Sequence, residues 1–455
     1  MPFHPPVEEW DADVFAGDPL GFPGYDERRR ALVDSGEESV RTGRTEHYAF
    51  VDGRFEVLGG TMGAAAGERV VRAYDRARDL RLPMVLATRT GGARLQEGMV
   101  ALAQLARTAA AAGRHARAGL LSLGVYGSPT TGGVFASYGS LVDVRASYEH
   151  AVIGFAGPRV AEGTLGVSLP ARSHTAEAAY DHGLVDELLV PGGAGEWVDV
   201  ALGLVERPMP TRPLPVWSDP GAGGAWGEVL RARAIGRPTG IDRAARLATS
   251  WLELRGTDPV IRAGLATVAG GRCVVVATDR YHGSGRPTPA GFGLAQRAIA
   301  LAGRLGLPVV TVVDTPGADP SPESEARGIA GEIAHTFEAM AACPTPTVSV
   351  CVGEGGSGGA MALSYADRLL ISEHAIFSVI APEGAAAILE RDVTRSPDVA
   401  SLLKLSSKDL QDLGLAEVIP EGQAALGEAV ARALAEATPG DREARFDAAT
   451  ARWLI

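Results

Sequence analysis

Lysine is almost missing from this sequence of 455 residues. Only Lys404 and Lys408 occur, so arginine supplies nearly all of the 43 basic residues. Neither lysine lies in a glycine-rich P-loop pattern or in a setting typical of a Schiff base. Catalysis through a lysine amine and P-loop binding of nucleotides are therefore excluded as main functions.

Cysteine is scarce, and two other signals are absent. Cys273, Cys343 and Cys351 show no C-x-x-C spacing, so we predict neither a metal site nor a disulfide framework. No basic-then-apolar leader and no run of ~18–20 apolar residues occurs. The net charge of −12 argues against nucleic acid as the main partner. We expect a cytoplasmic protein that binds neither membranes nor nucleic acid.

Glycine is abundant, and it gathers in one stretch, 346–363. Glycine makes up 58 of the 455 residues, about twice the usual ~7%. The stretch reads as a β-branched buried strand, then five glycines within 353–359, then a helix start. Such a turn exposes backbone N–H groups beside the positive end of a helix dipole. It is typical of a site that holds a phosphate or a transient oxyanion.

Three interpretations of this turn compete. Gly353, Gly355 and Gly358 fit the G-x-G-x-x-G dinucleotide pattern. Gly355, Ser357 and Gly359 fit the G-x-S-x-G nucleophile elbow of hydrolases. A tight turn whose glycines serve packing alone is the third alternative.

The first half of the chain contains the same pattern. In each half, three apolar strands end in turns of the same kind and order, with helices between them. Gly92 and Gly133 are 41 residues apart, and Gly317 and Gly359 are 42 apart. We interpret two copies of a unit of about 200 residues in which strands and helices alternate. The predicted class is α/β, with two tandem domains.

Composition indicates where the copies begin and end. Residues 207–227 contain five prolines and little periodicity, which predicts a linker. The expected domains are 18–206 and 228–438, and the tail, 439–455, is expected to be a loosely attached helix. Near the N-terminus, Asp52-Gly53 predicts a hairpin between strands over 48–56 and 55–60.

The repeat argues against both single-site interpretations. The only histidine after Ser357 is His374, with Asp367 seven residues before it, which leaves no room for a usual hydrolase triad. The first copy has no serine at the matching position. The copies share backbone amides, and paired amides of this kind stabilise a thioester enolate. The candidate catalytic residues are Gly91, Gly92, Gly132 and Gly133 in the first copy and Gly317, Gly358, Gly359 and Ala360 in the second.

Several long motifs resemble a known family. GGARLQEG at 91–98, TTGGV at 130–134 and IGFAGPRV at 153–160 look like the β subunit of bacterial acetyl-CoA carboxylase carboxyltransferase. Its α subunit is similar to GRPTPAG at 285–291, DTPGA at 314–318, GEGGSGGA at 353–360 and SVIAPEG at 378–384. The resemblance covers roughly 18–435, with the two subunits fused in one chain.

The resemblance implies two crotonase (ClpP-like) spiral ββα domains that act on an acyl-CoA. It implies that Gly91 and Gly92 hold the thioester oxyanion, and that Gly359 and Ala360 polarise the ureido carbonyl of carboxybiotin. Carboxybiotin would arrive on a separate carrier protein, with a biotin carboxylase as a possible partner. A homodimer or higher homo-oligomer and a role in fatty acid or polyketide biosynthesis, with a malonyl-CoA-type product, are also implied.

The chain also departs from the family pattern. It has no four-cysteine zinc ribbon, and Ala385 stands where the α subunit usually has cysteine after Pro-Glu-Gly. A biotin-independent decarboxylase of malonyl-CoA or malonyl-ACP thioesters therefore remains an alternative, as does an inactive scaffold. The sequence leaves CoA and acyl carrier protein both open as the thiol of the substrate.

A few single residues carry weaker predictions. Arg94 and Arg159 follow glycine turns and are candidates for CoA phosphates, although Arg94 could instead fix its loop to Glu97. Glu354 and Glu383 could take part in proton transfer, but structural hydrogen bonding is the favoured interpretation. Gly355 and Gly356 complete the cofactor-binding candidates, and His282 and His335 are the histidines to test first.

Overall fold

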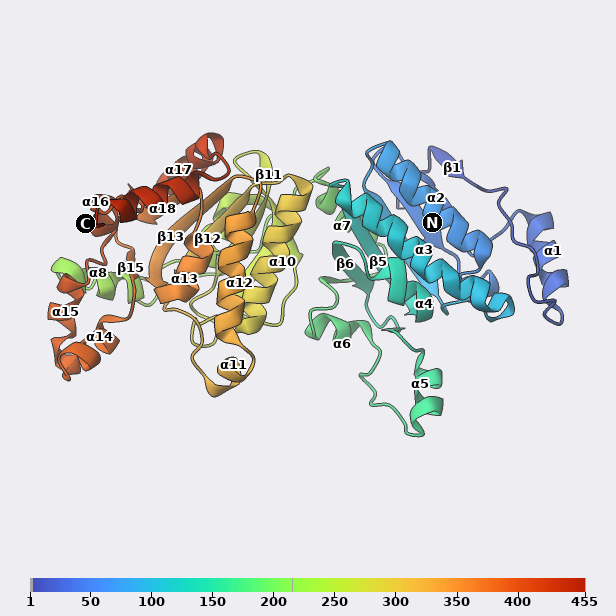
Figure 1. Ribbon diagram of the computed structural model, residues 1–455, viewed down its shortest axis with the longest axis horizontal. Helices are drawn as coiled ribbons and strands as arrows, with labels where there is room; N and C mark the ends of the chain where they lie inside the picture. Colours follow the sequence, from blue (N-terminus) through green and yellow to red (C-terminus); the bar gives the residue numbers. More distant parts are fainter. Residues whose placement is uncertain (1–2, 215, 455) are drawn as a thin grey trace. The chain divides into compact units, whose positions relative to one another are not determined.

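A computed structural model describes residues 3–214 and 216–454, and the chain forms two compact units, Met1–Leu202 and Gly203–Ile455. Each unit consists of a mixed β-sheet with helices packed on it (Figure 1). Within the described ranges, no helix is long and apolar enough to cross a bilayer. The four domain and linker ranges predicted from the sequence stay a prediction.

The two sheets have the same strand order. The first runs β1-β2-β3-β4-β5-β6-β8 with β7 beside β5, and the second runs β9-β10-β11-β12-β13-β14-β16 with β15 beside β13. In both sheets the first three strands pair antiparallel and all later pairs are parallel. The repeat predicted from the sequence is therefore present strand by strand.

The strands of each unit have the following bounds. The first sheet contains β1 (Glu8–Trp10), β2 (Val40–Arg44), β3 (Ala49–Gly53), β4 (Met84–Thr90), β5 (Ser122–Thr131), β6 (Val144–Tyr148), β7 (Ile153–Gly154) and β8 (Glu187–Leu189). The second sheet contains β9 (Ala248–Leu254), β10 (Ile261–Val268), β11 (Gly271–Thr278), β12 (Val309–Thr315), β13 (Thr347–Gly356), β14 (Arg368–Ser372), β15 (Ile376–Ser378) and β16 (Glu417–Ile419). Every residue of β12 and β13 is buried, as expected for parallel strands covered on both faces.

Helices cover both sheets. The first unit has α1 (Tyr25–Ser35), α2 (Ala64–Asp79), α3 (Gly98–Arg117), α4 (Gly132–Val134), α5 (Pro158–Leu165), α6 (Ala176–Asp181) and α7 (Ala194–Leu202), with short helices at Leu58–Gly60, Leu95–Glu97 and Phe135–Gly139. The second has α8 (Gly224–Arg233), α9 (Gly240–Leu247), α10 (Pro289–Leu305), α11 (Pro322–Ala326), α12 (Ile329–Ala342), α13 (Ser357–Ser364), α14 (Pro382–Leu389), α15 (Ser396–Leu402), α16 (Ser407–Asp412), α17 (Gln423–Glu436) and α18 (Asp441–Ala451), with a short helix at Val393–Arg395.

The long helices of each unit pack in pairs, and their ends carry residues typical of helix termini. In Figure 1, α2 and α3 run side by side in the first unit, and α10 and α12 do so in the second. Helix α10 begins with Pro289, whose fixed backbone angle suits the first helical position. It ends before Gly306, whose φ of 71° allows the left-handed turn that stops a helix.

The hairpin predicted at Asp52-Gly53 is wrong. The turn lies earlier, at 45–48, between β2 and β3, and Asp52 falls inside the end of β3. The Thr45 hydroxyl accepts hydrogen bonds from the backbone N–H groups of His47 and Tyr48, both at 3.2 Å. This side-chain capping stabilises a turn without the Asp-Gly pair.

The C-terminal tail is not loosely attached, which corrects a second expectation. Arg442 of α18 is buried and lies 2.9 Å from Asp367, which is itself fully buried. The same guanidinium donates to the carbonyl oxygens of Ala341 and Cys343 at 2.7 and 2.6 Å. The helix therefore neutralises a charge in the core of the second unit.

We predict that Arg442→Met destabilises the second unit by about 3–5 kcal/mol, because Asp367 would remain buried without a cation. The measurement is urea denaturation of the full chain followed by circular dichroism. Glu443→Ala, an exposed neighbour on the same helix, should change stability by less than ~0.5 kcal/mol. Equal effects of the two substitutions would contradict the anchoring role of Arg442.

Candidate active site

The first glycine turn follows β4. Gly92 has a φ of 107°, a left-handed value that favours glycine, and its N–H donates to the Thr90 hydroxyl at 2.9 Å. The N–H of Gly91 donates to the carbonyl of Gly59 at 2.9 Å. A Cβ atom on Gly132, at the start of α4, would lie 2.6 Å from the Cα atom of Gly92. The two backbones therefore touch, with no room for a side chain between them.

The second unit repeats this turn after β12. Gly317 has a φ of 119°, and its N–H donates to the Thr315 hydroxyl at 3.2 Å. A Cβ atom on Gly359 would lie 2.6 Å from the Ala318 nitrogen. Both units thus place a Thr-x-Gly turn against the helix start that follows the next strand.

Strand register fixes which residues correspond. Thr90 pairs with Thr130, and Thr315 pairs with Gly355, after the same register shift in both sheets. Gly133 lies three residues after Thr130, and Gly358 lies three residues after Gly355, so Gly133 corresponds to Gly358. The spacing of glycines in the two halves of the sequence had matched Gly133 with Gly359. The structure corrects that match by one residue.

Not every candidate amide is free to bind a ligand. Gly91 and Gly92 already have acceptors, the carbonyl of Gly59 and the hydroxyl of Thr90. Ala360 is buried in the first part of α13. Gly359 is buried as well. The roles of Gly359 and Ala360 at the ureido carbonyl stay predictions.

In each unit, two backbone N–H groups near the turn are candidates for hydrogen bonds to a ligand. Within the described part of the chain, the N–H groups of Ala93 and Ala318 have no hydrogen-bond acceptor. Gly133 and Gly358 lie in the first turns of α4 and α13, where N–H groups lack partners inside the helix, and both are partly exposed. The sequence did not predict Ala93 or Ala318, because the candidates were chosen for their place in the glycine motifs.

Ser357 occupies the position of Gly132 and has a φ of 56°. Its side chain is exposed and forms no hydrogen bond with any residue that the structure describes. No histidine orients it, so the geometry gives no support to a hydrolase.

Gly355 and Gly356 serve packing, which corrects their assignment to cofactor binding. Both are buried in β13. A Cβ atom on Gly355 would overlap the ring of Phe377, and one on Gly356 would overlap the backbone of Pro316. Glycine is needed here so that the turn after β12 can lie against β13.

Arg94 is not a ligand for CoA phosphates. Its side chain is buried, forms ion pairs with Glu38 and Glu97, and donates to Tyr25. Burial, followed by the hydrogen bond to Glu97, raises the pKa of Tyr25 to about 12. The alternative prediction, that Arg94 fixes its own loop, agrees with these contacts. Arg159 is exposed in the first turn of α5 and stays a candidate for phosphate binding.

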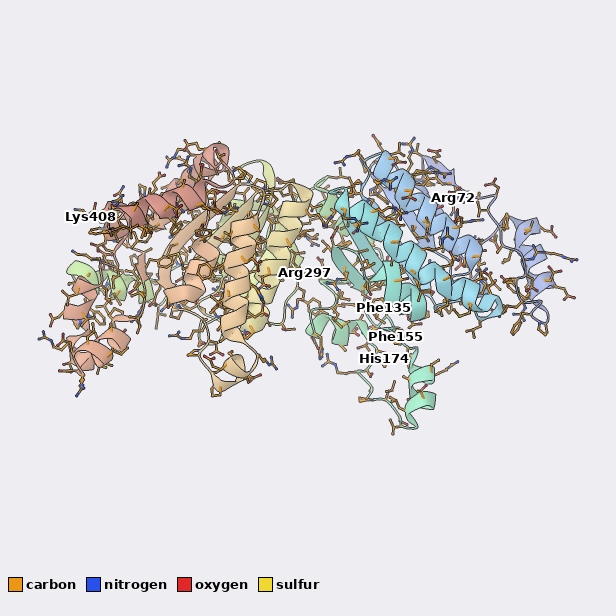
Figure 2. All side chains as sticks on the ribbon, viewed as in Figure 1. Arg72, Phe135, Phe155, His174, Arg297 and Lys408 are labelled. Atoms are coloured by element: carbon orange, nitrogen blue, oxygen red, sulfur yellow. The ribbon has the colours of Figure 1, made fainter. Side chains whose placement is uncertain are left out.

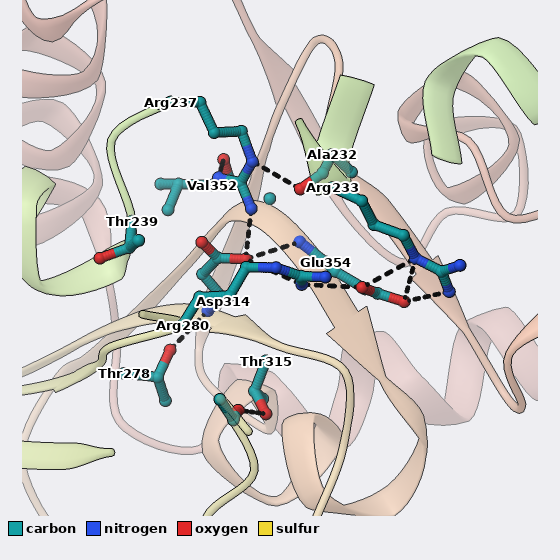
Figure 3. A network of polar contacts seen from close by, with 12 residues as sticks. Ala232, Arg233, Arg237, Thr239, Thr278, Arg280, Asp314, Thr315, Val352 and Glu354 are labelled. Carbon is teal, nitrogen blue, oxygen red and sulfur yellow. Dashed lines mark hydrogen bonds and ion pairs between the residues drawn. The ribbon is translucent and has the colours of Figure 1, made fainter. Parts of the chain in front are cut away.

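A buried ionic network lies beside the second turn (Figure 3). Asp314 accepts from Arg237 at 2.6 Å and from the backbone N–H of Glu354 at 3.0 Å. Glu354 in turn accepts from Arg233 at 2.6 Å and from Arg280 at 2.7 Å. Sequence reasoning noticed Glu354 but none of the three arginines, since they come from segments distant in the chain.

The network leaves Glu354 no role as a base. Burial alone would raise its pKa, but hydrogen bonds from Arg233 and the charge of Arg280 outweigh burial and lower the pKa. Glu383 also pairs with Arg233, at 2.6 Å. These contacts agree with the prediction that Glu354 and Glu383 form structural hydrogen bonds. Their side-chain partners are arginines rather than the loop amides that we expected.

Arg286 is a further residue that the sequence did not single out. Its guanidinium donates to the carbonyl oxygens of Pro316 and Ala318 at 3.3 and 3.5 Å. It has no carboxylate within ion-pair distance in the described residues, and it is partly exposed. A cation at the second turn could hold the negative end of a ligand.

The two histidines marked for testing lie differently. His282 contacts Asp279 through Nδ1 at 2.6 Å, with its ring more than half exposed. His335 lies exposed on α12. No described group of histidine, cysteine and carboxylate side chains could hold a metal ion.

Each unit has a pocket beside its glycine turn. In the first unit, Phe135, Phe155 and His174 line a pocket of about 600 Å³, and Figure 2 shows them near one another below the sheet. In the second unit, Ser357 and Gly358 lie at the rim of a pocket of about 410 Å³. Its walls are mainly apolar, formed by Phe337, Met361, Phe377, Leu403, Leu410 and Leu413.

Comparison with known proteins identifies the family of the chain. Residues 40–186 match the model of the carboxyl transferase domain, and 224–438 match the model described as acetyl co-enzyme A carboxylase carboxyltransferase-like. A fused acetyl-coenzyme A carboxylase carboxyl transferase, subunits beta/alpha, of Parafrankia sp. (strain EAN1pec) is 38% identical. The match spans 98% of this chain and 83% of that protein. The chain belongs to the acetyl-CoA carboxylase carboxyltransferase family.

Other relatives agree with this assignment. A probable biotin-dependent acyl-coenzyme A carboxylase beta3 subunit of Mycobacterium bovis is 36% identical over 93% of this chain and 88% of its own length. A transcarboxylase 12S structure with bound methylmalonyl-coenzyme A and methylmalonic acid has a TM-score of 0.73 at 20% identity. That match covers 87% of this chain and 81% of the transcarboxylase, and it confirms the expected fold of two tandem crotonase-like domains. The carboxyltransferase interpretation is confirmed, whereas these relatives give the decarboxylase alternative no support.

We predict that Glu354→Gln destabilises this carboxyltransferase near neutral pH and less so in acid. The folded-state pKa of Glu354 is lowered, so its ionic contribution is complete above the unfolded value of about 4.3 and is lost as pH falls through the folded value. The urea midpoints of wild type and Glu354→Gln should therefore differ by a constant amount down to about pH 4.3 and converge as the pH falls further. Glu323→Gln, on an exposed helix turn, should show no such convergence, and a pH-independent gap for Glu354→Gln would contradict the assignment.

Proposed function

We propose that the chain moves CO₂ between carboxybiotin on a separate carrier protein and the α-carbon of an acyl-CoA, giving a malonyl-CoA-type product. The repeated Thr-x-Gly turn is the observation that carries this proposal. Carboxyl transfer involves two carbonyl compounds, a thioester and a ureido group, and each needs hydrogen-bond donors as negative charge develops on its oxygen. A chain with two matched turns has one set of donors for each.

The first turn is assigned to the thioester. Gly91 and Gly92 shape it, and we propose that the amides of Ala93 and Gly133 donate to the enolate oxygen. Two amides held by the fold stabilise that charge without reorganising in the transition state. Arg159, exposed in the first turn of α5, is the candidate for CoA phosphates.

The second turn is assigned to the carboxyl donor. Gly317 shapes it, and Ala318 and Gly358, with Gly359 packed behind them, would face the ureido carbonyl. The apolar walls beside Gly358, including Phe337 and Phe377, fit an uncharged bicyclic ring. Bound there, biotin supplies the carboxyl group and the nitrogen that receives the α-proton, whereas this chain binds, orients and holds charge.

The remaining expectations are proposals of the same kind. We infer that the protein acts in the cytoplasm, as a homodimer or higher homo-oligomer, with a biotin carboxylase and carrier as partners. We also infer domains at 18–206 and 228–438, a linker at 207–227 and a tail at 439–455. A role in fatty acid or polyketide synthesis follows from the malonyl-type product.

The test supplies the purified chain with malonyl-CoA in the presence and absence of free biotin. We expect formation of acetyl-CoA to require biotin, because the carboxyl group that leaves malonyl-CoA bonds to the biotin ring nitrogen, and the proton of that nitrogen passes to the α-carbon. Release of CO₂ at the same rate without biotin would contradict the proposal and favour the decarboxylase. Thioester binding without turnover under either condition would favour the scaffold.

A further inference from the structure

A second pocket of the C-terminal unit lies away from the glycine turns. It has a volume of about 270 Å³ and is bounded by α8, α9, β13 and the segments that follow β14 and β16. Arg231, Arg237 and Arg243 line it, together with His374 and Glu421. None of the residues proposed above to bind thioester or biotin belongs to its lining.

The basic side chains of this pocket differ in how closely a carboxylate lies to each of them. Arg231 lies 3.0 Å from Asp219, and Arg237 lies 2.6 Å from Asp314. His374 lies 3.0 Å from Glu228. These three groups each have a close carboxylate outside the pocket.

Arg243 is the exception. Its nearest carboxylate, Glu421, is 3.6 Å away, and the amide oxygen of Gln423 is 3.5 Å away. The side chain is nonetheless only 15% exposed. Burial lowers the pKa of Arg243, and the neighbouring charges of Arg237 and Arg246 lower it further, while Glu421 partly opposes them. A buried cation with such a distant partner gains from a second anion.

The rest of the pocket is apolar. Trp217, Pro238 and Val352 form part of its wall. The cavity is larger than a lone inorganic anion requires, so its shape suits an anionic head attached to a small organic group. An indole face accepts such a group, in particular a planar one.

We propose that this pocket binds a small phosphate monoester, with Arg243 contacting the phosphate and the organic group lying against Trp217. Arg237 lines the same pocket, but its guanidinium already donates to Asp314 and to the carbonyl oxygens of Ala232, Pro238 and Val352. The side chain of Glu421 is 38% exposed and lies 3.6 Å from Arg243, so the phosphate can displace it from this arginine. Arg237 also contacts Asp314 beside the second turn. Occupancy of the pocket is thereby connected to the ionic network of the carboxyltransferase site.

Calorimetric titration of the full chain with phenyl phosphate tests the proposal, and Trp217 fluorescence locates the binding. We expect saturable binding that is tighter than that of inorganic phosphate. Arg243→Gln should weaken binding at least about tenfold, since a charge-assisted hydrogen bond is lost. Arg246→Gln, an exposed arginine on the same helix, should weaken it by less than about twofold.

Three outcomes would overturn the proposal. One is no saturable binding of phenyl phosphate at millimolar concentration. Another is equal weakening by Arg243→Gln and Arg246→Gln, which would indicate non-specific attraction. The third is a fluorescence change that persists in Trp217→Phe, which would place the ligand elsewhere. With the proposal correct, Trp217→Phe abolishes the fluorescence change while the calorimetric signal persists.

Discussion

The proposed chemistry depends on one steric constraint. In each unit the backbone of a turn must lie directly against the start of a helix, with no side chain between them. Gly92 meets Gly132 in the first unit, and Ala318 meets Gly359 in the second, at separations that exclude a Cβ atom. Backbone N–H groups from two different segments are thereby brought together, which no pair of flexible side chains would achieve with the same rigidity.

The two units hold this contact by different means. In the first unit, buried Arg94 pairs with Glu38 and Glu97, so the segment after the turn is fixed by ion pairs in the interior. In the second unit, Asp314 at the end of β12 pairs with Arg237 and accepts the backbone N–H of Glu354. Buried ion pairs contribute little net stability but make alternative arrangements costly. The two units therefore share the contact between turn and helix start, whereas the residue pair that touches and the charges beside it differ.

The repeated arrangement of strands and turns could be predicted from the sequence, whereas the roles of arginines that pair with distant carboxylates could not. The paired glycine turns and alternating strands were visible because spacing and burial are local properties, and the strand order confirms the repeat. Matching Gly133 with Gly359 failed by one residue, since only strand register fixes the correspondence. Arg442 and Arg237 acquire their roles from carboxylates far away in the chain. Arg94 was ambiguous until its burial became visible, because a glycine turn followed by arginine suits either role.

The infrared stretching frequency of the thioester carbonyl of acetyl-CoA, labelled with ¹³C, tests most directly whether the first turn polarises the thioester. With the wild-type chain, a shift to lower frequency on binding is expected. Gly92→Val should abolish this shift, because a left-handed turn in contact with Gly132 cannot accept a side chain. Gly317→Val in the second turn, and Gly163→Val at an open helix position, should leave it unchanged. A shift that survives Gly92→Val and disappears with Gly317→Val would contradict the assignment of the thioester to the first turn.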